Sequence, residues 1–96
     1  MRRNEILRIL SEHRSQTGRF GVKSLALFGS VAREEASSQS DVDILVEFDS
    51  PPSFDRYMGL KFYLDDLLGV RVDLVTPRAL KPRVRSYVEQ EAVYVP

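Results

Sequence analysis

A Gly-Ser pair, followed after ten residues by two aspartates with one residue between them, constrains this chain more than any other feature. The pair is Gly29 and Ser30, and the aspartates are Asp41 and Asp43. The first pair ends an apolar run and the second begins another, and short apolar runs of this kind are typical of buried strands. The sequence therefore predicts one strand that ends in a tight turn and a neighbouring strand that begins with two acids.

These residue types at this spacing suit the binding of phosphates and metal ions. Gly29 allows a ligand to approach the backbone closely, and Ser30 can cap a following helix whose first N–H groups attract phosphate. Side chains two positions apart on a strand share one face, so the carboxylates of Asp41 and Asp43 can converge on divalent cations. A phosphate-binding turn beside a metal-binding strand indicates a nucleotidyl-transfer site.

With these motifs the chain resembles the nucleotidyltransferase superfamily that includes DNA polymerase beta and the aminoglycoside nucleotidyltransferases. It is most similar to the minimal nucleotidyltransferases, whose hallmark is Gly-Ser, ten residues and Asp-x-Asp. The resemblance extends from Leu25 to Val93 and includes a later apolar strand that contains Asp73. It implies an α/β fold of the minimal polymerase-beta type, in which helices flank a small mixed β-sheet.

The resemblance assigns three aspartates to catalysis and to metal binding. Asp41 and Asp43 are expected to bind two Mg2+ ions. Asp73 matches the third carboxylate of the family, on a strand expected to lie beside Asp43, where it completes the metal shell or accepts the proton of the attacking hydroxyl. The alternative is that these are ordinary strand acids, and Asp73 would then need a partner such as Arg71.

Three further residues are expected to bind the nucleotide, which is ATP. Ser30 would hold a phosphate through its hydroxyl and backbone N–H beside Gly29, and Arg33 would neutralise triphosphate charge. The alternatives are a simple helix cap for Ser30 and a surface ion pair with Glu34 or a neighbouring acid for Arg33. Relatives often carry glycine after this arginine, whereas this chain has Glu34, so the turn is expected to be helical there.

The hydrophobic pattern predicts alternating helices and strands. We expect helices over residues 2–16, 31–36 and 54–68 and after Pro77, strands over 22–28, 41–48 and 71–76, a short edge strand at 93–95, and a loop at 37–40. Gly69 is the expected C-cap of the helix over 54–68.

Composition limits the kinds of partner that the chain can bind and the cell compartment in which it is expected. Fourteen Lys and Arg balance fourteen Asp and Glu, and a net charge of zero argues against direct nucleic-acid binding. No apolar run is long enough to span a membrane, and there is no cysteine for a disulfide. We therefore expect residues 1–96 to form a single nucleotidyltransferase domain located in the cytoplasm.

Three functions are open. The resemblance implies an enzyme that transfers AMP from Mg-ATP to a hydroxyl, and minimal nucleotidyltransferases of this pattern are typically antitoxins that modify a tyrosine of a partner HEPN-type ribonuclease toxin. A second possibility is an antitoxin that neutralises its partner by binding alone, which the intact set of acids disfavours. A third is an aminoglycoside-type nucleotidyltransferase, which the lack of a C-terminal helical domain disfavours.

Overall fold

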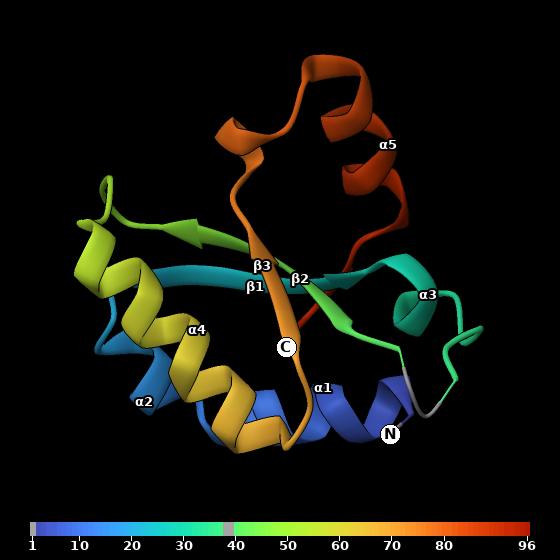
Figure 1. Ribbon diagram of the computed structural model, residues 1–96, viewed down its shortest axis with the longest axis horizontal. Helices are drawn as coiled ribbons and strands as arrows, with labels where there is room; N and C mark the ends of the chain where they lie inside the picture. Colours follow the sequence, from blue (N-terminus) through green and yellow to red (C-terminus); the bar gives the residue numbers. More distant parts are fainter. Residues whose placement is uncertain (1, 38–39) are drawn as a thin grey trace.

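A computed structural model of the chain describes residues 2–37 and 40–96, and helices alternate with strands along it (Figure 1). The helices are α1 (Arg3–Glu12), α2 (Arg14–Gly18), α3 (Gly29–Ala32), α4 (Phe54–Leu68) and α5 (Pro82–Glu91), with a short 3-10 helix η1 (Pro77–Ala79). The strands are β1 (Val22–Phe28), β2 (Val42–Phe48), β3 (Val72–Val75) and β4 (Val93–Tyr94). None of the helices in these two ranges is long and apolar enough to cross a membrane.

The four strands form one mixed sheet in the order β3-β2-β1-β4. Strand β1 pairs antiparallel with β2 and with the edge strand β4, whereas β2 and β3 run parallel. The register places Asp43 opposite Phe28 of β1 on one side and opposite Asp73 of β3 on the other. The predicted small mixed sheet with flanking helices is therefore confirmed, and the end of β1 meets the starts of β2 and β3.

The two faces of the sheet are covered by different helices. Val42 and Ile44 are buried in the main core, which also contains apolar side chains of α1 and α4. Leu45 points the opposite way, because side chains alternate along a strand, and it forms a second cluster with Ala26 and with Val88 of α5. Figure 1 accordingly shows α1 and α4 on one side of the strands and α5 on the other.

Helix α4 forms as the sequence predicts. The Ser53 hydroxyl caps its first turn by accepting the Arg56 N–H at 3.1 Å. Leu60 and Leu64 are buried one turn apart. Gly69 ends the helix in the left-handed conformation, with φ 69°, as the predicted C-cap.

Two polar contacts attach β3 to α4. The Asp65 carboxylate accepts the N–H of Val72 at 2.8 Å and pairs with Lys61 Nζ at 2.7 Å. The Tyr57 hydroxyl donates to the carbonyl of Leu74. Because these contacts lie on either side of residue 73, α4 fixes the position of that residue in the sheet.

Two predicted helices differ from the structure. The helix expected over 2–16 is divided at His13 into α1 and α2. The helix expected over 31–36 is α3, which ends at Ala32 because Glu34 takes a left-handed conformation with φ 58°. The N–H of Glu35 bonds to the carbonyl of Ser30, and that of Glu34 to the carbonyl of Val31, a pattern that closes a helix. The expected helical turn at Glu34 is therefore wrong, and part of the loop expected at 37–40 lies outside the described residues.

Candidate active site

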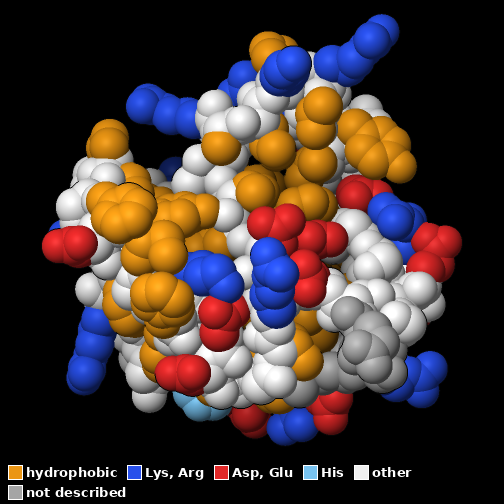
Figure 2. Space-filling view, viewed as in Figure 1, with side chains coloured by type: hydrophobic (Ala, Val, Ile, Leu, Met, Phe, Trp, Pro, Cys, Tyr) orange, Lys and Arg blue, Asp and Glu red, His pale blue; other side chains and the backbone are white. Residues whose placement is uncertain are grey.

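Asp43 and Asp73 lie side by side on the face of the sheet that carries α5. They are direct partners in the parallel pairing of β2 with β3. Their strand neighbours, among them Val42 and Val72, point into the main core, so the two carboxylates point to the opposite face. In the space-filling view, acidic side chains gather near the centre of the molecule, with basic ones beside them (Figure 2).

The pKa of Asp43 shows how crowded the carboxylates are. This pKa is raised to about 6, first by partial burial, then by the negative charges of Asp73 and Asp41 and by a hydrogen bond with Asp73. The positive charge of Arg33 acts in the opposite direction. Neighbouring carboxylates that repel one another in this way are stabilised by a bound cation.

Asp41 occupies a different position from the other two acids. It precedes β2, is exposed, and its Oδ2 lies 3.8 Å from Nε of Arg71. Within residues 2–37 and 40–96, no three acidic or histidine side chains are grouped so as to hold a metal ion. The structure thus brings Asp43 and Asp73 together and turns Asp41 toward Arg71, and the metal role of the three stays a prediction.

Gly29 provides the close backbone approach that the sequence suggests. It has φ 72°, and a Cβ built on it would lie 3.0 Å from Cγ of Asp43 and closer still to one carboxylate oxygen. Only glycine fits, because a side chain would overlap that carboxylate and this backbone conformation is unfavourable for other residues. The turn after β1 is therefore packed directly against the first acid of β2.

Ser30 does not cap α3, so this alternative for Ser30 is wrong. The helix begins at Gly29, which makes Phe28 the residue at the N-cap position and places Ser30 inside the first turn. Its side chain is partly exposed and lies one residue from the contact between Gly29 and Asp43. The nucleotide role of Ser30 stays a prediction.

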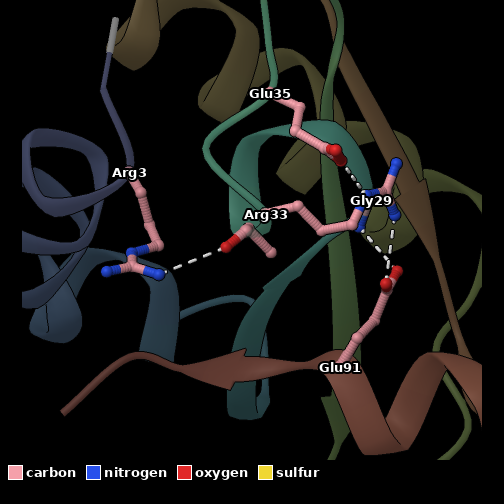
Figure 3. Close-up of polar contacts among 6 residues, drawn as sticks. Arg3, Gly29, Arg33, Glu35 and Glu91 are labelled. Atoms are coloured by element: carbon pink, nitrogen blue, oxygen red, sulfur yellow. Dashed lines mark hydrogen bonds and ion pairs between the residues drawn. The ribbon is translucent and has the colours of Figure 1, made fainter.

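Arg33 is held by two acids, as Figure 3 shows. Its Nε lies 2.6 Å from Oε1 of Glu35, and its Nη1 lies 3.0 Å from Oε2 of Glu91. These hydrogen bonds raise the pKa of Arg33. Glu34 instead approaches Arg3, at 3.6 Å. The expected surface ion pair of Arg33 is present, with acids other than Glu34.

Glu91 is the residue of this region that the sequence did not reveal. Besides Arg33 it binds the backbone N–H of Gly29, through Oε1 at 2.9 Å. It is 62 positions from Gly29 and ends α5, a helix whose hydrophobic pattern gives no reason to place it near the site. Only the packing of α5 on the sheet brings it there.

A hollow of about 350 Å3 lies farther along the same strands. Its lining includes Glu47, Phe48, Pro51, Pro77 and Arg78. Glu47 is four positions from the first acid of the strand and therefore points to the same face of the sheet. The hollow lies at the ends of β2 and β3, whereas the acidic pair lies at their starts.

A comparison with protein-family models matches the nucleotidyltransferase domain over residues 3–95. The chain belongs to this family. A protein from Thermococcus cleftensis named protein adenylyltransferase MntA is 47% identical over 92 residues, which cover 95% of this chain and 93% of the relative. A solved structure described as a "putative minimal nucleotidyltransferase" is 44% identical, has a TM-score of 0.84, and is matched over 97% of this chain and 95% of its own.

More distant solved structures share the fold. A toxin-antitoxin complex with AMP-PNP has a TM-score of 0.70 at 22% identity, over 99% of this chain and 73% of the other. A complex of a tri-AMPylated HEPN toxin from Shewanella oneidensis with an MNT antitoxin has a TM-score of 0.65 at 20% identity, over 93% and 71%. The predicted family and the prediction of an enzyme, a nucleotidyltransferase of the protein adenylyltransferase kind, are confirmed by the closer relatives.

Proposed function

We propose that this nucleotidyltransferase transfers AMP from ATP to a tyrosine hydroxyl of a HEPN-type toxin and so acts as its antitoxin, with residues 1–96 as one domain. The observation that carries the proposal is the pairing of Asp43 with Asp73 against the Gly29 turn. This pairing places two acids beside a turn whose glycine lets a ligand come close to the backbone. The use of ATP fits the cytoplasmic location expected from the sequence.

The names of the similar proteins support a HEPN-type toxin as the acceptor of AMP. A relative with 47% identity along nearly the whole chain is named a protein adenylyltransferase. A protein of the same fold is an antitoxin in complex with an AMPylated HEPN toxin, and another such complex contains an ATP analogue. These names support an acceptor that is itself a folded protein.

The acids of the site fit Mg2+ by their chemistry. Carboxylate oxygens are the ligands that this ion prefers, and the mutual repulsion that raises the pKa of Asp43 favours a cation. We propose that Asp43 and Asp73 bind it and that Asp41 joins them by leaving Arg71, since an exposed pair at 3.8 Å contributes little. When bound, Mg2+ supplies positive charge to the phosphate oxygens.

The remaining chemistry falls to the chain's own groups. Asp73 is exposed and can accept the proton of the tyrosine hydroxyl while that oxygen attacks the α-phosphorus. The bond from the α-phosphorus to the bridging oxygen breaks, and pyrophosphate leaves with the electron pair. Ser30 and Arg33 lie in the first turns after β1, where they can hold the triphosphate.

Intact-mass spectrometry of a purified HEPN-type toxin from the same organism tests the proposal. Incubation with the protein and Mg-ATP should add the mass of one AMP or a small multiple, and the double variant Asp41→Ala/Asp43→Ala should add none. The matched control is Asp55→Ala/Asp66→Ala, which removes two exposed acids of α4 and should retain the activity. A toxin that gains no AMP from the wild type, yet is neutralised equally well by the double variant, would show that binding alone is the function.

A further inference from the structure

Glu91 makes two bonds with two different parts of the proposed site. Its Oε1 accepts the N–H of Gly29 at 2.9 Å, and its Oε2 pairs with Nη1 of Arg33 at 3.0 Å (Figure 3). The side chain is well shielded, with 18% of it exposed, and it reaches the site from the last turn of α5. The proposed function assigns no role to this residue.

The first bond holds the Gly29 turn. Gly29 begins α3, so its N–H has no partner within that helix, and the Glu91 carboxylate satisfies it. The Cα of Gly29 packs against the Asp43 carboxylate with no space for a further atom. The position of this turn beneath Asp43 therefore depends on what holds its N–H.

The second bond holds the Arg33 side chain. An arginine has many rotamers, and fixing one of them costs conformational entropy. Glu35 also binds Arg33, at 2.6 Å, but that acid is 62% exposed and the structure gives it no contact with Gly29 among the described bonds. Glu91 is thus the shielded partner, and it alone of these two acids joins Arg33 to the turn.

We propose that Glu91 is a positioning residue for nucleotide binding and AMP transfer, which holds the Gly29 turn and Arg33 in the arrangement that receives the triphosphate. The inference rests on the proposed function for its reaction, but its first consequence is the affinity for Mg-ATP. Because Glu91 belongs to α5, the C-terminal helix becomes part of the nucleotide site without touching the nucleotide.

Three substitutions distinguish the effect of losing the two Glu91 bonds from the effect of removing a negative charge near Arg33. Glu91→Ala removes both bonds, whereas Glu91→Gln loses the ion pair with Arg33 and keeps an oxygen that can accept the Gly29 N–H. Glu35→Gln is the matched control, because it removes the other ion pair of Arg33 and leaves Gly29 untouched. All four proteins are compared below the lowest melting temperature of the set, so that each is folded.

Calorimetric titration with Mg-ATP and initial rates of AMP transfer are the measurements. We expect Glu91→Ala to raise Kd and KM for Mg-ATP about tenfold or more, as loss of a charge-assisted hydrogen bond does. Glu91→Gln should recover part of this loss, Glu35→Gln should stay within about twofold of the wild type, and kcat should change less than KM. In the ligand-free protein, Glu91→Ala should also speed hydrogen exchange at the Gly29 amide.

Several results would overturn the inference. Unchanged Mg-ATP affinity in Glu91→Ala would do so, as would an equal loss in Glu35→Gln. Tighter binding in Glu91→Ala would show that this carboxylate competes with the triphosphate. If Glu91→Ala does not fold, the same comparison of Glu91→Gln with Glu35→Gln decides the matter. A wild type that binds Mg-ATP but modifies no toxin would contradict the proposed function only.

Discussion

At the scale of single residues, the contact between Gly29 and Asp43 has the sharpest consequence. Gly29→Ala should lower the free energy of unfolding by about 1–2 kcal/mol, because alanine is unfavourable in a left-handed conformation. It should also reduce AMP transfer more than tenfold, since the new Cβ displaces the Asp43 carboxylate. Urea unfolding and the mass assay measure the two effects.

Gly69→Ala is the matched control for that substitution. Gly69 has nearly the same φ, 69°, but nothing lies within 4 Å of a Cβ placed there. Gly69→Ala should therefore lower the free energy of unfolding by a similar amount but retain AMP transfer. Full activity in Gly29→Ala, or an equal loss of activity in both variants, would contradict the argument.

The raised pKa of Asp43 makes a prediction about pH. An acid with a folded-state pKa of about 6, above its unfolded value of 3.8, favours the folded state when protonated and disfavours it when ionised. Without metal, Asp43→Asn should therefore melt at a higher temperature than the wild type at pH 8. The difference should shrink as the pH falls through 6 and nearly vanish by about pH 4. A variant no more stable than wild type at pH 8 in EDTA would refute this.

At the scale of elements, Asp65 joins α4 to β3. Its burial raises its pKa, but the hydrogen bonds from Lys61 and the Val72 N–H outweigh this effect, and the net pKa is lowered. Such a group stabilises the fold above its unfolded pKa, and the stabilisation is lost as the pH falls through the folded pKa. Asp65→Asn should therefore reduce the free energy of unfolding at pH 7 by about 1 kcal/mol.

Urea unfolding at pH 7 and in acid checks the Asp65 prediction. The difference from wild type should decrease in acid, where the wild-type carboxylate is also neutral. Lys61→Met is the control, because it removes only the i,i+4 ion pair and should cost about 0.5 kcal/mol or less. An unchanged unfolding midpoint for Asp65→Asn at pH 7 would show that this acid does not join the two elements.

The elements also show what the sequence could and could not predict. Helix α4 was predictable because its period, its Ser53 cap and Gly69 are all local signals. The short α3 was not, because Glu34 takes a left-handed conformation, which is uncommon for residues other than glycine and which its residue type does not predict. The resemblance to the minimal nucleotidyltransferases predicted that Asp73 lies beside Asp43, but Glu91 depends on a contact 62 positions away, which no local signal encodes.

At the scale of the whole molecule, ligand binding should raise the free energy of unfolding. Mg-ATP binds only the folded chain, so at about 100 times Kd it adds roughly 2.7 kcal/mol, which for a domain of this size corresponds to an increase in Tm of about 10–20 °C. Thermal unfolding monitored by circular dichroism measures this. We expect little increase with ATP in EDTA and little in Asp41→Ala/Asp43→Ala. The same increase with and without Mg2+ would contradict a metal-dependent site.

The position of residues 91–94 beside β1 and the Gly29 turn determines at what stage of translation the site can form. Strand β1 takes β4 as its second neighbour, and the Gly29 turn takes its N–H partner from Glu91, so both are completed by residues 91–94. A ribosome has thus translated all three aspartates well before the parts that support them. The nascent chain holds its proposed catalytic acids early but gains a finished nucleotide site only when residues 91–94 have left the ribosome.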